Sequence, residues 1–170
     1  MVKEWDRAPD FTAPIARPEA AAGRRGEYTG EDVGSFTLSD RLVYGPVVLA
    51  FFPGVYSRTC TQELCDVRDW HDTLGDLDAQ VYGVSADTPF SQLAFIDEYD
   101  LNFPLVSGFN TDVIAAYGVR NDEGQLAGIA NRSMFVIDEE QTVTYRWEVH
   151  EPLTFPDLDE IEEAVESATG

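Results

Sequence analysis

The chain contains few of the residues that most sharply restrict function. Its 170 residues include two histidines and two cysteines, Cys60 and Cys65. No apolar run approaches the ~18 residues of a membrane-spanning helix, so no membrane segment is expected. The histidines, His71 and His150, show no ligand spacing with the cysteines, and two cysteines alone make a poor zinc site. The sequence therefore predicts neither a bound metal nor a cofactor.

Positive charge is scarce. The chain has one lysine, Lys3, and ten arginines, compared with 32 acidic residues, which gives a net charge of −21. Nucleic acid binding is disfavoured, because a phosphate backbone needs a positive stripe and none is visible. The acidic residues are spread along the chain, as on a solvated surface, and suggest a halophilic source in which concentrated salt screens their repulsion. An acidic mesophilic protein is the alternative.

The length fits one domain with a proper core, which we place at residues 2–169. Residues 1–6 lack the apolar stretch of a signal peptide, so the expected location is the cytoplasm. In that reducing compartment, two cysteines five positions apart are more often catalytic or redox-active than structural.

Strand and helix patterns alternate along the chain, which indicates an α/β fold around a mixed sheet. Residues 15–33 show no periodicity and read as an inserted, mobile surface loop. The predicted strands are 47–52, 80–84, 104–106, 132–138 and 143–148, and the predicted helices are 61–74, 89–99, 113–117 and 156–167.

The segment from Pro53 to Cys60 joins a buried strand to a helix start. Unpaired backbone N–H groups and the positive end of the helix dipole would favour a thiolate at Cys60. Ser57, three residues earlier, is close enough to bond the sulfur or an approaching oxygen, and Pro53 stiffens the turn. The alternative is that Cys60 is a small buried apolar residue, as free cysteines often are.

The pattern Pro53-x-x-x-Ser57-x-x-Cys60 resembles the active-site motif Pro-x-x-x-Thr/Ser-x-x-Cys of the peroxiredoxins. Further segments match this family in order and spacing. The stretch from Cys60 to Asp69 is most similar to the bacterioferritin comigratory protein branch, or Q-type, with the AhpE-like branch next. The further matching segments are 8–12, 34–40, 81–87, 101–107, 115–119 and 131–138.

The resemblance implies a thioredoxin-like fold, a central mixed sheet flanked by helices with an N-terminal β-hairpin. It also implies a peroxidase in which Cys60 attacks hydrogen peroxide or an organic hydroperoxide while Arg132, from a distant strand, supplies a fixed positive charge. Cys65 matches the resolving cysteine of the Q-type branch, and a thioredoxin- or glutaredoxin-like protein would be the reductant. The protein would be a monomer or a homodimer.

Helix geometry sets a condition on that pairing. Five residues of α-helix separate two Cα atoms by about 8.6 Å, whereas a disulfide tolerates about 7 Å. The first helical turns must therefore unwind before Cys60 and Cys65 can bond. Alternatively, Cys65 packs in the interior and the enzyme uses one cysteine. A thioredoxin-like disulfide oxidoreductase is a weaker alternative, because the chain has no Cys-x-x-Cys.

Overall fold

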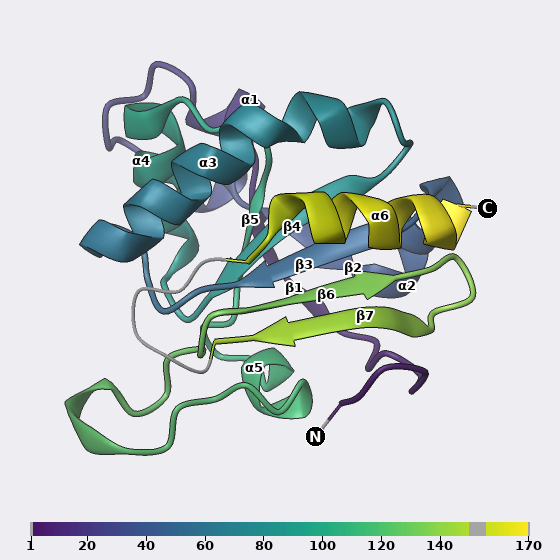
Figure 1. Ribbon diagram of the computed structural model, residues 1–170. Helices are drawn as coiled ribbons and strands as arrows, with labels where there is room; N and C mark the ends of the chain where they lie inside the picture. Colours follow the sequence, from purple (N-terminus) through teal and green to yellow (C-terminus); the bar gives the residue numbers. More distant parts are fainter. Residues whose placement is uncertain (1, 150–155, 170) are drawn as a thin grey trace.

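The computed structural model of the protein describes residues 2–149 and 156–169, apart from the side chains of 73–75 (Figure 1). Seven strands in this part of the chain form one sheet, in the order β2-β1-β5-β4-β3-β6-β7. The strands are β1 (Thr12–Ala16), β2 (Gly34–Thr37), β3 (Val47–Phe51), β4 (Gln80–Ser85), β5 (Leu105–Ser107), β6 (Ser133–Ile137) and β7 (Val143–Glu148). The helices are α1 (Pro18–Ala21), α2 (Leu38–Arg41), α3 (Arg58–Gly75), α4 (Pro89–Tyr99), α5 (Val113–Ala116) and α6 (Leu158–Thr169), with 3₁₀ turns at Gly30–Asp32, Leu42–Tyr44 and Gly124–Leu126.

The sheet is mixed, as predicted. β3 pairs in parallel with β4, and β4 with β5, while β1, β2, β6 and β7 join by antiparallel pairing. Parallel strands point their carboxyl ends to one edge, so the segments after β3, β4 and β5 meet there. Phe51 pairs with Ser133, so the residue before β6 also lies at this edge. The active-site candidates of the sequence converge on it.

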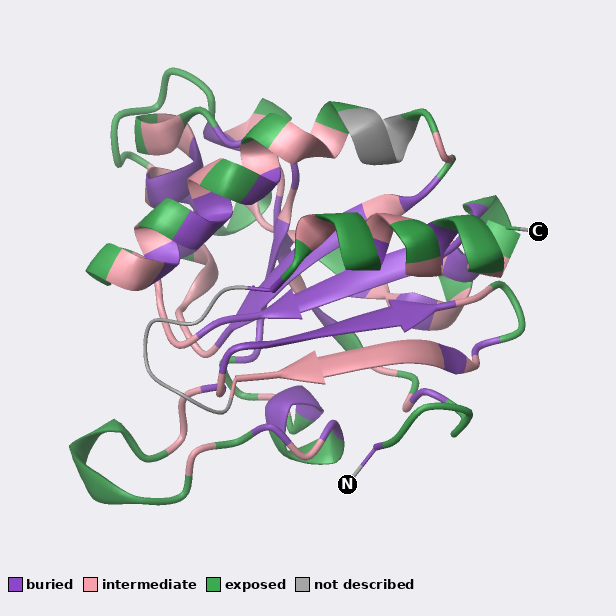
Figure 2. Cartoon of the chain, viewed as in Figure 1, coloured by how far each residue is buried: buried purple, intermediate pink, exposed green. Residues whose placement is uncertain are grey.

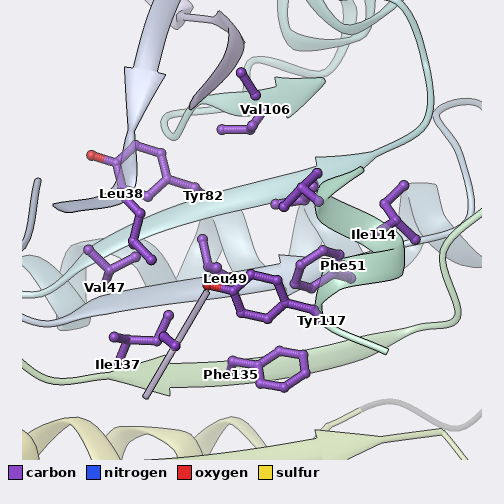
Figure 3. Close-up of a cluster of buried hydrophobic side chains, with 14 of the residues drawn as sticks. Leu38, Val47, Leu49, Phe51, Tyr82, Val106, Ile114, Tyr117, Phe135 and Ile137 are labelled. Carbon is purple, nitrogen blue, oxygen red and sulfur yellow. The ribbon is translucent and has the colours of Figure 1, made fainter. Parts of the chain in front are cut away.

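The central strand β3 is buried on both faces (Figure 2). Because successive side chains alternate between faces, Leu49 and Phe51 pack on one side and Val48 and Ala50 on the other. The first face is filled by an aromatic cluster around Tyr117 and Phe135, with α5 and α2 (Figure 3). The second face is covered by α3, α4 and α6, and Cys60 belongs to its core. This explains the uninterrupted apolar run at 47–52.

The segment 15–33 is more structured than a surface loop. Ile15 and Ala16 belong to β1 and are buried, and residues 18–21 form the short helix α1 against α4. The fully buried Ala21 explains the helix, because it gives the segment an apolar contact with the core. Our prediction that residues 15–33 form a surface loop is thus wrong for the first residues of this range. That the segment is an insertion stays a prediction.

Other element bounds differ from the predicted ones by a few residues. α4 and β7 match the prediction, whereas α3 begins at Arg58, three residues before the predicted start. Cys60 therefore lies inside the first turn and not ahead of it. In the described residues, no helix is long and apolar enough to cross a membrane.

Candidate active site

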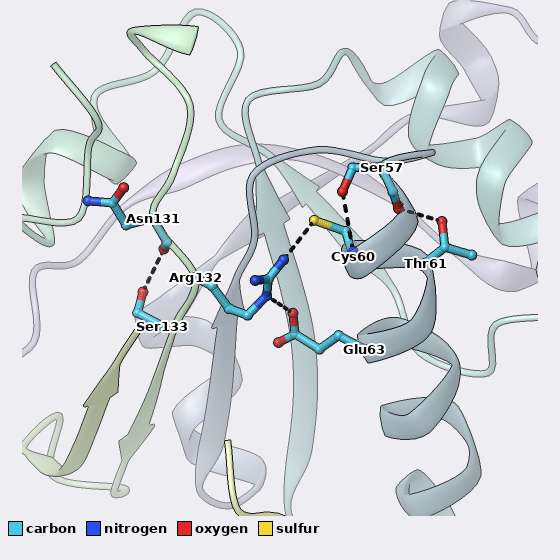
Figure 4. Close-up of polar contacts among 7 residues, drawn as sticks. All are labelled: Ser57, Cys60, Thr61, Glu63, Asn131, Arg132 and Ser133. Atoms are coloured by element: carbon cyan, nitrogen blue, oxygen red, sulfur yellow. Dashed lines mark hydrogen bonds and ion pairs between the residues drawn. The ribbon is translucent and has the colours of Figure 1, made fainter. Parts of the chain in front are cut away.

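Cys60 is fully buried in the first turn of α3. The Ser57 hydroxyl accepts a hydrogen bond from the Cys60 backbone N–H at 3.3 Å, and the Ser57 carbonyl accepts two bonds from Thr61 (Figure 4). Ser57 thereby satisfies a backbone donor that the helix start leaves open, as an N-cap residue does. We expected its hydroxyl to bond the sulfur or an approaching oxygen. Among the described residues it bonds the Cys60 backbone, and contact with an oxygen stays a prediction. The Cys60 N–H is thus satisfied by this bond.

Arg132 lies directly before β6 and points at the sulfur across the sheet edge (Figure 4). Its Nη2 donates to Cys60 Sγ at 3.2 Å, and its Nε donates to Glu63 Oε2 at 2.5 Å. The antiparallel pairing of β6 with β3 brings this arginine beside a residue 72 positions away. A guanidinium is suited to both contacts because its donors form a rigid planar fork. The structure thus joins Cys60 and Arg132, as the sequence suggested.

Glu63 is the polar residue that the sequence undervalued. It lies three positions after Cys60 on α3, is 2% exposed, and forms a buried ion pair with Arg132. Burial raises the pKa of Glu63 to about 7, while the charge and the hydrogen bond of Arg132 act the other way. Burial lowers the pKa of Arg132, but Glu63 and Cys60 outweigh it and the net shift is upward. The i, i+3 spacing from Cys60 was the available signal.

Cys65 lies farther along the same helix and is half-buried; both cysteines are free thiols. Since α3 is continuous through both positions, their Cα atoms are about 8.6 Å apart and their side chains point about 140° away from each other. Burial raises the pKa of the Cys65 thiol, an effect that nearby Arg68 opposes. In this state the two sulfurs cannot bond.

None of the other candidate residues forms a hydrogen bond with the Cys60 sulfur in the described part of the chain. Pro53 is half-buried in the loop after β3, and Arg58 is exposed. His71 is half-buried with its ring 6.0 Å from that of Phe103, and burial lowers its pKa. His150 lies outside the described residues. Within the described chain, no three His, Cys, Asp or Glu side chains gather in a way that could hold a metal.

Taken together, the geometry provides a cysteine at a capped helix start, a guanidinium 3.2 Å from its sulfur, and a buried carboxylate that holds the guanidinium. An opposite charge at this distance stabilises a thiolate. After an oxygen binds, the same guanidinium can meet the charge that develops on it. The site is built for nucleophilic sulfur chemistry.

Comparison with known proteins identifies the family of this chain. The model of the AhpC/TSA family matches residues 5–146. A chloroplastic 2-cysteine peroxiredoxin of Chattonella marina var. antiqua is 30% identical over 151 residues, which cover 85% of this chain and 69% of that protein. The matches to two further curated relatives span 52% and 51% of their lengths.

Solved structures extend the likeness over the whole chain. Peroxidoxin BcpB of Mycobacterium tuberculosis shares 26% identity with a TM-score of 0.77, and the match covers 98% of each chain. AhpC of the same organism, at 21% identity and a TM-score of 0.80 over 98% of this chain and 93% of that one, confirms the thioredoxin-like fold. The chain therefore belongs to the AhpC/TSA family, the peroxiredoxins, which are thiol-dependent peroxidases.

Proposed function

We propose that this chain reduces hydrogen peroxide and organic hydroperoxides through Cys60. The thiolate sulfur attacks one peroxide oxygen, the O–O bond breaks, and Cys60 becomes a sulfenic acid. The other oxygen leaves as hydroxide or alkoxide and takes up a proton to give water or an alcohol. The observation that carries this proposal is the contact between Arg132 Nη2 and Cys60 Sγ at 3.2 Å.

In this scheme each neighbour of Cys60 has a distinct part. Arg132 stabilises the thiolate and then the charge on the peroxide oxygens. Glu63 holds the Arg132 guanidinium in place by accepting a hydrogen bond from Arg132 Nε. Ser57 caps the helix start and so sets the direction of the Cys60 side chain. Pro53 shapes the loop that shields the sulfur. The direct test is consumption of peroxide by the purified protein with dithiothreitol as reductant.

We further propose that Cys65 resolves the sulfenic acid. Its thiol attacks the Cys60 sulfur, water leaves, and a disulfide forms that an external thioredoxin- or glutaredoxin-like dithiol reduces. Because the two Cα atoms are about 8.6 Å apart in an intact helix and a disulfide tolerates about 7 Å, the first turns of α3 must unwind. In the alternative, Cys65 is structural and an outside thiol reduces the sulfenic acid directly.

The Cys65→Ser variant distinguishes these schemes. We expect its first peroxide turnover to keep the wild-type rate, because Cys65 does not contact the sulfur of Cys60. The intramolecular disulfide should be lost and sulfinic acid should accumulate under excess peroxide, since no resolving thiol remains. Stopped-flow kinetics and free-thiol counts measure both. A variant that accumulates no more sulfinic acid than wild type under excess peroxide would contradict the resolving role.

The Glu63→Gln variant tests the buried pair through pH. Glu63 has a pKa of about 7 in the folded protein and an ordinary value of 4.5, so the folded state binds this proton more tightly. Its stabilising contribution is therefore complete below pH 4.5 and is lost as pH rises through 7. Glutamine can still accept the Arg132 bond but does not ionise. We expect wild type to lose stability relative to the variant between pH 5 and pH 8, an interval of about 3 units, in urea titrations. An unchanged difference across this range would contradict the burial effect.

The finer assignments are also proposals. The similarity to peroxidoxin BcpB over the full chain supports placement in the Q-type branch. The net charge of −21 supports a halophilic source, in which case the thermal midpoint should rise as KCl is added, because salt screens like-charge repulsion. We propose a cytoplasmic protein, monomeric or homodimeric.

A further inference from the structure

A buried polar network lies beneath the loop that leads to Cys60. Asp87 follows β4, whose parallel pairing with β3 places it beside this loop. One oxygen of Asp87, Oδ2, accepts hydrogen bonds from the Val55 backbone N–H at 2.9 Å and from the Ser85 hydroxyl at 2.6 Å. The carbonyl of Asp87 accepts a third bond from the Ser107 hydroxyl at 2.5 Å. Asp87 thus links the ends of β4 and β5 to the catalytic loop.

The network continues into α4. Gln92 Nε2 donates to the Ser85 hydroxyl and to the Val106 carbonyl, both at 3.0 Å. Ser85, Gln92 and Ser107 are each fully buried. A polar group in such an interior is costly unless it is bonded, and the hydrogen bonds of Ser85, Ser107 and Gln92 Nε2 offset this cost, while Gln92 Oε1 has no partner in the described structure. The rigid group of side chains reaches the catalytic loop through Asp87 and the Val55 N–H.

The next residue of the loop is held from another side. Tyr56 has a left-handed backbone, with φ of 68°, which a non-glycine residue adopts at a cost. Its ring packs on α4, 5.2 Å from the ring of Phe95 and 6.4 Å from that of Tyr99. The backbone strain persists because the contacts on both sides fix the loop. Val55 and Tyr56 lie five and four residues before Cys60, so their placement decides where Ser57 and α3 begin.

We propose that Asp87 is a positioning residue for peroxide reduction, one that aims Cys60 at Arg132 by holding the Val55 N–H. The proposal rests on the peroxidase function proposed above. Asp87 has a second consequence for resolution by Cys65. While the bond to Val55 is in place, the chain is fixed on the amino-terminal side of α3, and unwinding is confined to the residues after it. Loss of the bond frees the loop, which slows attack on peroxide and eases opening of the helix.

The test compares four variants in single-turnover reactions with hydrogen peroxide. We expect Asp87→Ala to lower the second-order rate constant of Cys60 oxidation about tenfold, since misplaced reacting groups cost rates of this order or more. It should also raise the ratio of disulfide to sulfinic acid under excess peroxide. Asp87→Asn should stay near wild type, because its amide oxygen can accept both bonds. Ser85→Ala should fall in between.

Asp138→Ala is the matched control. The Asp138 carboxylate accepts two backbone N–H bonds, from Glu140 and Thr142, at the opposite edge of the sheet. This control should lower the thermal midpoint and leave both the rate constant and the product ratio unchanged. If a general loss of stability were the cause, the rate constant would instead fall in the control and in the Asp87 and Ser85 variants alike.

Three results would overturn the proposal: a folded Asp87→Ala protein with the wild-type rate constant and product ratio, an Asp87→Asn protein as slow as the alanine variant, or a control that slows equally. If the Asp87→Ala protein does not fold, the Ser85→Ala protein is the deciding variant. A wild-type rate constant of Cys60 oxidation in Ser85→Ala would reject the positioning role of the network. A wild-type protein that does not react with peroxide would reject the proposed function itself. If wild type and all the variants react with peroxide at the same rate, only the positioning role of Asp87 is rejected, and the proposed peroxidase function stands.

Discussion

Replacing Cys60 with serine should reduce peroxide consumption to the background level, a loss of at least about 10³-fold. A serine hydroxyl is not ionised at neutral pH, and the contact with Arg132 that favours a thiolate has no comparable effect on an alcohol. Cys65, the other cysteine of the chain, should not take over, because within the described residues its sulfur accepts no hydrogen bond from a guanidinium, whereas that of Cys60 does.

The control for this variant is Cys65→Ser, which removes the same atom from the same helix. It should retain the first turnover, whereas Cys60→Ser should have none while keeping a wild-type thermal midpoint within a few degrees. Peroxide loss measured with equal protein concentrations separates the two. Substantial catalytic consumption by the Cys60→Ser protein would place the chemistry elsewhere.

Replacing Arg132 with methionine should slow Cys60 oxidation by about 10²- to 10³-fold, the usual effect of removing one group that stabilises developing charge. It should also destabilise the fold by about 3 kcal/mol, because Glu63, which is 2% exposed, loses its partner. Arg132→Lys should fall in between. An ammonium keeps the charge but lacks the planar fork that contacts Cys60 and Glu63 together.

Two comparisons separate the catalytic effect from the structural one. The double variant Arg132→Met with Glu63→Gln removes the unpaired charge, so it should recover stability without recovering the rate. Arg120→Met breaks an exposed ion pair with Asp122 and should change neither quantity appreciably. Recovery of the rate in the double variant would show that Arg132 acts only through stability.

Much of this site could be predicted from the sequence, because its main residues follow strong local patterns. Cys60 lies between a continuous apolar strand and a helix, and Pro53 and Ser57 have a recognisable spacing from it. The role of Arg132 was predicted only from the resemblance to a family, since nothing local to residue 132 shows that β6 pairs with β3. Long-range pairing of this kind is invisible to periodicity.

The two carboxylates of the site, Glu63 and Asp87, are the residues whose roles depended most on the structure. They are two of 32 acidic residues in a chain with acids throughout, and composition does not distinguish them from the others. Their roles depend on burial and on partners from other elements, Arg132 for one and Val55 and Ser85 for the other. The bond that Ser57 makes to the backbone was not foreseen for a related reason. The helix starts earlier than its apolar pattern, so the hydroxyl meets a backbone N–H.

The measurement that tests the central claim most directly is the intact mass of the fully reduced protein after one equivalent of hydrogen peroxide. Loss of two hydrogens with no free thiol remaining is the expected result, and it means that Cys60 was oxidised and then bonded to Cys65 after α3 opened. Gain of one oxygen with Cys65 still free would keep the peroxidase and leave Cys65 a packing residue. An unchanged mass with both thiols free would contradict the account.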